Sequence, residues 1–374
     1  FPAGYKYDYC NPDVLLNRLS VKDGLVVTPE GLSYKFIWIP ENKRMLPETL
    51  EKLHALLEQG ATVVANAPQR ICTLAGGDET QARFDKNVEA IWGKAADGSI
   101  TTIGKGRLLA GVTIEKAIEL LDLKQDVQGD VRWLHRHVKG ADWYFITPEK
   151  QQAFKGKISF RAQGAAELWD PITGEITPLN VERQGEYASI ELDMPKAGSC
   201  FVVFNHNKKQ QKVEKVALAN TQSIDNKWTV QFPEGWGAPA ELEIETLAPW
   251  CELPMSKEGQ AFSGSATYTT TFNWSNESKE VVLDLGKVSM IAEVFVNDQK
   301  VRTLWCTPYA ADITSYVKQG ENKLQVKVTS TWFNRLAFDA SLPEAERKTW
   351  TIEGPKANAK LKEYGLLGPV NIKY

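Results

Sequence analysis

The chain has 374 residues, of which 44 are basic and 47 acidic, so its formal net charge is −3. At about 150 residues per domain this length predicts two or three domains, and the near-neutral charge excludes the basic surface of a nucleic-acid-binding protein. Hydrophobic residues make up 43% and charged residues 24%, a balance that argues against disorder. No apolar run approaches the roughly 18 residues that a membrane span needs, so we expect a soluble chain.

Residues 1–125 alternate between strand-like and helix-like segments. The apolar run 35–40 predicts a strand that is buried on both faces. Leucines recur at helical spacing from Leu46 to Leu57, with Pro47 near the start and Gly60 just past the end, and predict a helix. There follow a buried strand over 61–65, a helix over 84–91, a strand over 108–110 and a helix over 114–121. This order predicts a small α/β layer with a parallel sheet, amidotransferase-like in fold.

From about residue 126 the hydrophobic period changes to two. Residues 126–215 carry short strands at 143–146, 158–161 and 200–204, with a tight turn at 169–175, and predict a small β-sandwich. Residues 216–374 alternate between apolar and polar residues over 266–272, 281–285, 292–296 and 323–328. That spacing predicts a third, all-β domain, a sandwich of the jelly-roll type.

The five cysteines lie far apart, at Cys10, Cys72, Cys200, Cys251 and Cys306. No pair has the spacing of a zinc or thioredoxin-type site, and the odd number argues against a complete disulfide framework. We interpret them mainly as small core residues. The chain begins at Phe1 with neither Met nor a signal sequence, which favours a mature product or a part of a longer protein.

Candidate catalytic residues are few. Cys72 is the one possible nucleophile of the α/β layer, but the glycines at 76 and 77 come four residues late for a nucleophile elbow. His135 and His137 share one face of a strand, yet no further ligand follows at metal spacing, so we expect structural hydrogen bonds and no metal site. Spacing alone cannot select two glycosidase carboxylates from 47 acidic residues, so no catalytic residue is predicted.

Aromatic and polar side chains gather in two stretches of the third region, 305–314 and 331–336. Indole and phenol rings suit the apolar C–H faces of a pyranose, and an amide can both donate to and accept from its hydroxyl groups. We predict that Trp305, Tyr309, Trp332 and Asn334 form a carbohydrate-binding site. Packing of these aromatic rings around the rim of the sandwich core is the alternative.

Several motifs of the third region resemble the sugar-binding β-sandwich of glycoside hydrolase family 2. They include Trp250-Cys251-Glu252-Leu253, Leu283-Asp284-Leu285-Gly286, Asn334-Arg335-Leu336 and Gly365-Leu366-Leu367-Gly368-Pro369-Val370. The upstream region is similar to the C-terminal half of glycoside hydrolase family 106, the α-L-rhamnosidases. That similarity includes Tyr7-Asp8-Tyr9-Cys10-Asn11-Pro12, His135-Arg136, Tyr144-Phe145, Ser159-Phe160-Arg161 and Trp169-Asp170-Pro171.

The resemblance implies an inverting hydrolase of terminal α-L-rhamnosides, assisted by calcium, whose acid and base carboxylates lie on an N-terminal (β/α)8 barrel. For the third region it implies a galactose-binding-like jelly roll. Nothing in the sequence reads as eight βα units. We therefore expect the C-terminal accessory part of such an enzyme, with no catalytic residue and no cofactor of its own, packed against its missing barrel.

Two other hypotheses remain open: a stand-alone carbohydrate-binding protein, and a hydrolase or amidotransferase centred on Cys72. Phe338 stands where relatives tend to carry glycine, which argues against a ligand role for that stretch. The expected partner is a rhamnose-containing glycan. A glycan-degrading enzyme has to meet polymeric substrate, so we expect export to the periplasm or the extracellular space, although the cysteine pattern does not require it.

Overall fold

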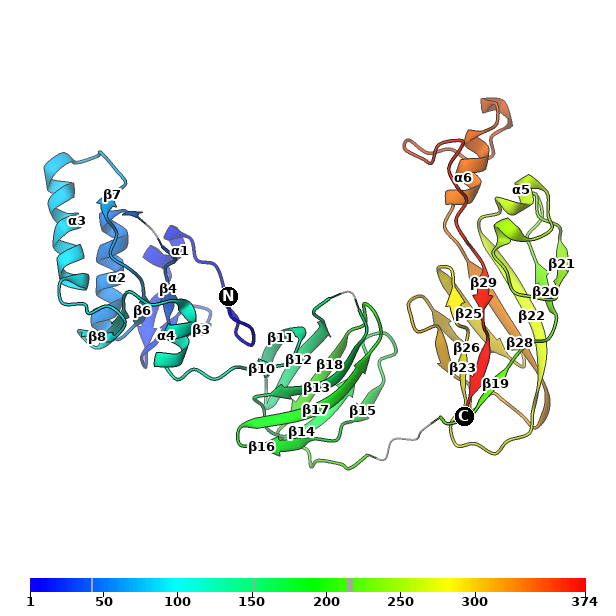
Figure 1. Cartoon of the computed structure of the whole chain (residues 1–374), viewed down its shortest axis with the longest axis horizontal. Coiled ribbons are helices and arrows are strands. Elements are labelled where there is room, and N and C mark those ends of the chain that lie inside the picture. The colour runs from blue at the N-terminus through cyan, green and yellow to red at the C-terminus, as the bar shows by residue number, and fades with distance from the viewer. Residues whose placement is uncertain (42, 151, 214–217) are drawn as a thin grey trace. The chain divides into compact units, whose positions relative to one another are not determined.

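The structure, a computed structural model, describes residues 1–41, 43–150, 152–213 and 218–374 (Figure 1). Its contacts divide the chain into two units. The first comprises Phe1–Trp133, Lys157–Gly164 and Val181–Glu191, and the second Leu134–Gly156, Ala165–Asn180 and Leu192–Tyr374. The division into domains at 125 and 215 stays a prediction, and its second boundary lies outside the described residues.

A four-stranded sheet with the order β4-β6-β9-β8 lies at the centre of the first unit. Strands β4 (Ile37–Trp38), β6 (Thr62–Val64) and β9 (Gly106–Leu109) are parallel, and β8 (Ile100–Ile103) runs antiparallel to β9. Helices α2 (Pro47–Gln59) and α3 (Gly77–Trp92) follow β4 and β6 in the chain. The parallel pairing and both helices agree with the sequence prediction, to which the structure adds β8.

Alternate residues of the parallel strands face opposite sides of this sheet. Val63 and Leu108 pack in one cluster with buried residues of α2 and α3. Val64 and Leu109 pack in another cluster with Ala117 of α4 (Ile114–Leu120). Helices therefore cover both faces, which gives the three layers of an α/β fold.

Helix α2 begins and ends where the sequence predicts. Pro47 occupies the first helical turn, where a missing N–H costs nothing, and Gly60 follows the last turn in the left-handed conformation at φ 117°. The leucines that predict the helix are buried against the sheet, among them Leu50, Leu53 and Leu57.

The predicted strand over 35–40 is shorter and more exposed than expected. Only Ile37 and Trp38 form β4, and Trp38 is 40% exposed. The expectation of burial on both faces is wrong because β4 is the edge strand of its sheet, where neighbouring elements enclose side chains less.

The remaining elements of the N-terminal segment are short. Asn11 caps α1 (Pro12–Asn17) by accepting a hydrogen bond from the backbone N–H of Val14. A small antiparallel sheet follows, formed by β1 (Ser20–Lys22), β2 (Leu25–Val27) and β3 (Ser33–Tyr34). Strands β5 (Arg44–Met45) and β7 (Arg70–Ile71) form a separate parallel pair.

Two further sheets occupy the middle of the sequence. One has the order β10-β13-β17-β16, formed by β10 (Val127–Gln128), β13 (Phe154–Phe160), β17 (Tyr187–Met194) and β16 (Glu182–Gln184). The other has the order β11-β12-β18-β14-β15, formed by β11 (Val131–Val138), β12 (Ala141–Pro148), β18 (Cys200–Asn205), β14 (Ala165–Trp169) and β15 (Ile176–Pro178). The strands predicted at 143–146, 158–161 and 200–204 coincide largely with β12, β13 and β18.

Two antiparallel sheets form the C-terminal domain. The larger has the order β21 (Glu241–Ile244), β20 (Trp228–Gln231), β22 (Ser265–Trp274), β28 (Gly320–Thr329), β25 (Ile291–Val296), β26 (Gln299–Leu304). The smaller has the order β19 (Thr221–Ser223), β30 (Asn371–Lys373), β23 (Val282–Asp284), β27 (Ala310–Asp312). Tyr268 and Val294 of the larger sheet share one buried core with Leu283 and Ile372 of the smaller, so this domain is a β-sandwich.

Polar groups inside this core are paired. The indole N–H of Trp250 donates to the hydroxyl of Tyr268 over 2.6 Å, and the backbone N–H of Leu366 donates to the same oxygen over 3.2 Å. Burial raises the pKa of Tyr268 to about 12. A side chain at Gly365 would place its Cβ 2.7 Å from that hydroxyl, so the close approach requires glycine.

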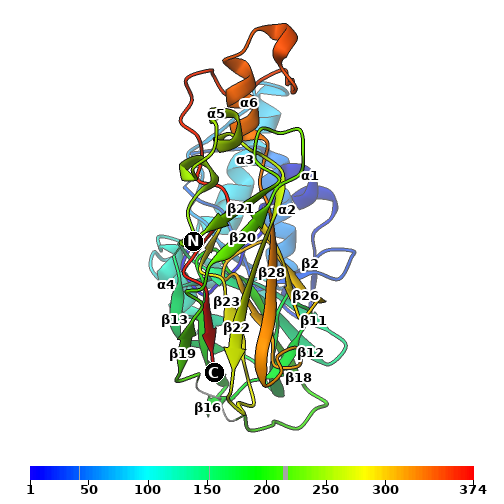
Figure 2. The ribbon, with the colours of Figure 1, turned by 90° about the vertical axis from the view of Figure 1, so that its right-hand side faces the viewer.

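Short helices lie at one end of the C-terminal domain. Helices α5 (Lys257–Gln260) and α6 (Phe333–Ala340) occupy the same end in both views (Figures 1 and 2). No helix is predicted from the sequence at the position of α6, which is therefore a finding of the structure. The smaller elements are η1 (Trp250–Glu252), η2 (Glu344–Glu346), and the strand pair β24 (Lys287–Val288) and β29 (Leu366–Gly368).

Two further features concern the described residues as a whole. Among the described residues no helix is long and apolar enough to span a membrane. Within the same residues, parallel pairing of named strands joins β4 with β6, β6 with β9, and β5 with β7.

Candidate functional site

Two of the four predicted sugar-contacting residues are exposed. Trp305 follows β26 and is 57% exposed, and Trp332, just before α6, is 43% exposed. The ring of Trp332 meets that of Trp236 edge to face, with centroids 5.0 Å apart. Both residues offer part of an aromatic surface to solvent, and sugar contact by them stays a prediction.

The other two predicted residues, Tyr309 and Asn334, are buried, and their polar atoms form hydrogen bonds with the backbone. Tyr309 is 8% exposed, and its hydroxyl donates to the carbonyl of Met290 over 2.7 Å. Asn334 is fully buried in α6; its amide nitrogen donates to the carbonyl of Lys362, and its amide oxygen accepts from the N–H of Lys362, both over 2.8 Å. Asn334 thus joins two backbone segments through both polar atoms of its amide, and sugar contact by it stays a prediction.

A buried ionic network holds the end of the domain around α6. The guanidinium of Arg335, fully buried, donates to Glu258 over 2.7 Å and to Asp339 over 2.6 Å. The second oxygen of Asp339 accepts from the backbone N–H groups of Lys348 and Thr349 and from the hydroxyl of Thr349. Burial favours the neutral form of Asp339, but these contacts outweigh it and lower its pKa. We call this cluster, together with Trp236, Trp332 and Asn334, the α6 corner.

Phe338 takes part in the same packing. Arg335 lies 5.3 Å from the ring centre of Phe338 and 5.5 Å from that of Trp236, so two aromatic rings border the guanidinium. The side chain of Phe338 therefore has a packing role in this chain.

Three of the four histidines surround one carboxylate. Asp142 of β12 accepts from His135 over 3.0 Å and from His137 over 2.8 Å through one oxygen, and from His206 over 2.8 Å through the other. Burial raises the pKa of Asp142, but the three hydrogen bonds outweigh it and the net pKa is lowered. The structural hydrogen bonding expected of His135 and His137 is confirmed.

Neither metal nor thiol chemistry finds support in the residues that the structure describes. They contain no group of three or more His, Cys, Asp or Glu arranged to hold a metal ion. Calcium prefers six to eight oxygen ligands, whereas the histidine cluster offers mainly nitrogen, so these residues do not fit the calcium that the resemblance implies. Cys72 is exposed, and in the described chain no hydrogen bond joins it to a base that could activate it.

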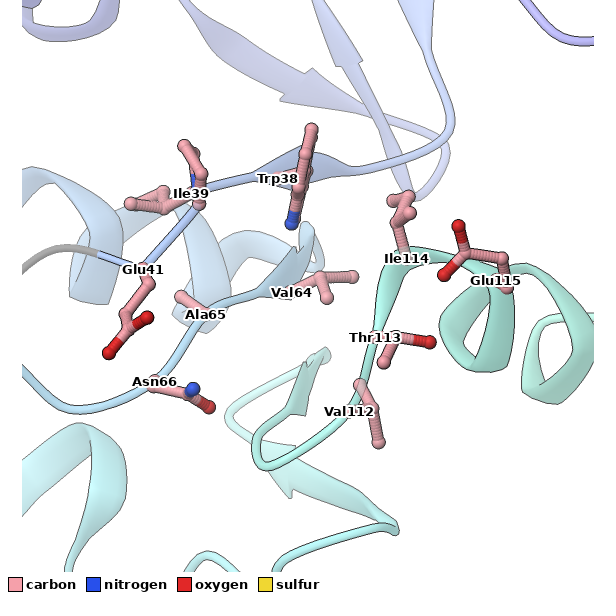
Figure 3. Close-up of a pocket in the computed structure, with 11 residues that line it drawn as sticks. Trp38, Ile39, Glu41, Val64, Ala65, Asn66, Val112, Thr113, Ile114 and Glu115 are labelled. Carbon is pink, nitrogen blue, oxygen red and sulfur yellow. The ribbon is translucent and has the colours of Figure 1, made fainter. Parts of the chain in front are cut away.

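The first unit contains a small open pocket at the carboxyl ends of its parallel strands (Figure 3). The last residues of β4 and β6, the residues that follow them, and the segment 112–115 at the start of α4 line a cavity of about 270 Å³. Crevices outside the carboxyl ends of parallel strands are common ligand sites in α/β folds. The volume lies just below the roughly 300–1,000 Å³ of typical small-molecule pockets, so a single small ring fits its size.

Polar side chains surround this pocket on two sides. Figure 3 shows Glu41 and Asn66 on one side and Thr113 and Glu115 on the other, with Trp38 between them. The amide oxygen of Asn66 accepts from the backbone N–H of Gly111 over 2.7 Å, which fixes its orientation. Hydrogen bonds from its own backbone N–H and from the Thr113 hydroxyl lower the pKa of Glu115, so it is ionised at neutral pH.

Sequence reasoning does not find these residues. The apolar run around Trp38 predicts a doubly buried strand, and no motif assigns a role to Asn66 or Glu115. The available signal is their position, because each follows the carboxyl end of a strand that the sequence does predict.

Comparison with known proteins gives two family matches. Residues 1–183 match the model of glycoside hydrolase family 106, described as alpha-L-rhamnosidase. Residues 256–362 match the galactose-binding domain-like model of glycoside hydrolase family 2. Over residues 1–183 the chain is similar to the α-L-rhamnosidases. The resemblance predicted from the sequence is thus confirmed, and the chain is glycoside hydrolase-like.

Two similar proteins are much longer than this chain. The structure of a rhamnosidase from Novosphingobium sp. PP1Y is 31% identical and matches 100% of this chain with a TM-score of 0.90. A protein of Formosa agariphila named "Putative beta-glucuronidase" is 37% identical over 174 residues, 39% of this chain. The chain spans 37% of the first protein's length and 15% of the second's.

Proposed function

We propose that this chain is the C-terminal accessory region of an enzyme of the α-L-rhamnosidase type, whose hydrolytic (β/α)8 barrel lies outside these 374 residues. The observation that carries the proposal is the match of the whole chain to 37% of a rhamnosidase structure at 31% identity. The family match over 1–183 supports the same assignment.

The pKa values of eight described carboxyl groups agree with an accessory role, because none of the eight is raised as that of a general acid is. Inverting glycosidases need a carboxylic acid whose pKa is raised, facing a carboxylate about 6.5–9.5 Å away. In the described chain the carboxyl groups with a shifted pKa all have it lowered: Glu30, Glu51, Glu115, Asp142, Glu258, Glu293, Asp339 and Glu363. Groups of this kind remain ionised at neutral pH and are poor general acids.

The finer parts of the proposal concern sugar, metal and location. The C-terminal domain is a galactose-binding-like jelly roll that contacts a rhamnose-containing glycan through Trp305 and Trp332, with Tyr309 and Asn334 in supporting positions. Calcium assists the barrel, and the enzyme acts in the periplasm or outside the cell. The galactose-binding-like match over 256–362 supports the carbohydrate contact.

A comparison of two proteins tests the proposal. The purified chain should hydrolyse an aryl α-L-rhamnoside no faster than a heat-killed control, and the protein from the complete reading frame should hydrolyse it well above that background. Turnover by the chain alone would contradict the accessory role. A complete reading frame without a barrel would favour a stand-alone carbohydrate-binding protein instead.

A further inference from the structure

The pocket at β4, β6 and β9 has the chemistry of a ligand site that the proposed function does not use. Within the described chain no residue accepts a hydrogen bond from the Nδ2 amide of Asn66, although its amide oxygen is held by Gly111. Glu41 forms no ion pair with any described residue, and Glu115 keeps its charge. The pocket therefore offers oriented donors and acceptors with unused capacity.

The lining selects against charged anions. Its acidic members are Glu41 and Glu115, and it contains no Lys, Arg or His among the described residues. A phosphate, sulfate or uronate would meet two carboxylates with no cation to balance it, which is unfavourable in a partly enclosed site. A neutral ligand with several hydroxyl groups avoids that repulsion and can donate to both carboxylates.

The apolar part of the lining favours a ring with a hydrophobic face. Trp38 is 40% exposed, although tryptophan carries a large apolar surface, and Ile39, Val64, Val112 and Ile114 complete the wall. A pyranose combines apolar C–H faces with hydroxyl groups at its edge, and a 6-deoxy sugar adds a methyl group that suits an aliphatic wall.

Trp38 also belongs to a strip of exposed aromatic rings. The ring centre of Phe1 lies 6.1 Å from that of Trp38 and 4.6 Å from that of Tyr7, and Tyr7 meets Tyr9 at 5.3 Å. Each of the four is at least 40% exposed, and Tyr9 is 92% exposed. The hydroxyl of Tyr34 donates to Asp8 over 2.7 Å and anchors this segment to β3. Successive sugar units of a glycan could thus stack beyond the pocket.

We propose that this pocket is a binding subsite for a neutral pyranose, most favourably a 6-deoxyhexose such as L-rhamnose, with Trp38 as the stacking ring and Asn66, Glu41 and Glu115 as hydroxyl partners. It is a second site, on the first unit, distinct from Trp305 and Trp332. The choice of a sugar as ligand rests on the proposed function, whereas the choice of a neutral one rests on the lining.

Indole N–H signals in NMR spectra of the ¹⁵N-labelled chain provide the test. Titration with L-rhamnose should shift the Trp38 signal, identified from its loss in Trp38→Phe, and should saturate in the millimolar range. L-mannose, which carries a hydroxyl in place of a methyl hydrogen, should bind more weakly, and D-glucuronate should cause no shift. Trp38→Ala should weaken binding up to about tenfold, read from the backbone amide signals of Asn66 and Thr113, because the stacking ring is lost.

Matched variants separate binding in this pocket from binding elsewhere on the chain. Glu115→Gln should weaken binding severalfold, whereas Glu119→Gln, on the same helix but outside the pocket, should leave it unchanged. Trp305→Ala should also leave it unchanged, so a failure of the sugar contact proposed for the C-terminal domain would not affect the result. Hydrolysis by the complete enzyme is a separate measurement.

Two results would overturn the proposal. One is the absence of any shift at Trp38 with L-rhamnose, and the other is an unchanged L-rhamnose affinity in Trp38→Ala, read from the backbone amide signals of Asn66 and Thr113. Unchanged signals of the other tryptophans confirm that the variants fold.

Discussion

The α6 corner and the pocket beside β4 both combine tryptophan with amide and charged side chains, but they use them differently. In the corner both polar atoms of Asn334 bind the backbone of Lys362, and both terminal nitrogens of Arg335 bind carboxylates. In the pocket Asn66 commits only its oxygen. The two regions therefore differ in their amide groups, because the Nδ2 of Asn334 donates to Lys362 whereas the Nδ2 of Asn66 has no acceptor among the described residues. Composition alone does not reveal this difference.

The largest effect is expected from breaking the ion pair in the corner. Asp339→Ala leaves the guanidinium of Arg335 buried with one carboxylate lost, and such a change costs about 3–5 kcal/mol of the free energy of unfolding. It also removes the acceptor for Lys348 and Thr349. Urea unfolding followed by tryptophan fluorescence measures the loss.

Glu245→Ala is the matched control for that variant. Lys227 and Glu245 form an exposed pair in the same domain, so its loss should change the free energy of unfolding far less than Asp339→Ala does. Equal costs in the two variants would show that the corner does not stabilise the domain and would weaken the contrast with the pocket.

A smaller effect is expected from Asn334→Ala. The variant removes both hydrogen bonds between the side chain and the backbone of Lys362, each worth about 0.5–1.5 kcal/mol of the free energy of unfolding. Hydrogen exchange at the Lys362 amide should become faster, whereas binding of any sugar should be unchanged. Asn226→Ala, which removes one hydrogen bond from an exposed side chain, is the control. A sugar affinity that falls in Asn334→Ala without faster exchange at Lys362 would support Asn334 as a sugar ligand.

The smallest effect concerns the histidine cluster, a third arrangement in which a carboxylate is fully engaged. The pKa of Asp142 is lower in the folded chain than the roughly 3.9 of an unfolded aspartate. Ionised Asp142 therefore stabilises the fold at neutral pH, and that contribution is lost as the pH falls below about 4 through the folded pKa.

Unfolding of the wild type and of Asp142→Asn at pH 7 and pH 3 checks this sign. The difference in the free energy of unfolding between them should be larger at pH 7 than at pH 3. Asp193→Asn, at an exposed position whose nearest cation, Lys155, lies 3.4 Å away, is the control. A difference that grows toward acid pH would reverse the assignment.

Local patterns predict the elements of this chain well. The leucines of α2, flanked by Pro47 and Gly60, give its bounds within a residue, and period-two alternation locates β22, β25 and β28. These signals are local, because helix and strand periods are properties of a short stretch. The family resemblance can also be predicted from the sequence, because the motifs that carry it occur in the expected order along the chain.

The candidate site is less predictable, because burial and partners depend on residues distant in sequence. Asn334 lies in a helix that no local sequence pattern predicts, and its hydrogen-bond partner Lys362 is 28 positions away. The apolar neighbours of Trp38 predict a core position, and only the strand order places it at an edge. Exposure of an aromatic ring is a property of the sheet and cannot be read from the run of residues that contains it.

The position of β30 has a consequence for how the C-terminal domain folds. This strand lies between β19 and β23, so Thr221, near the start of the domain, pairs with Lys373 at the far end of the sequence. During synthesis β19 cannot pair with β30 until almost the whole domain has been translated. Such pairing over a long sequence separation gives the domain a high contact order and makes its folding slow. Until β30 arrives, β19 and β23 expose backbone groups that can pair with other chains, so this is the interval in which the chain is most prone to aggregate during expression.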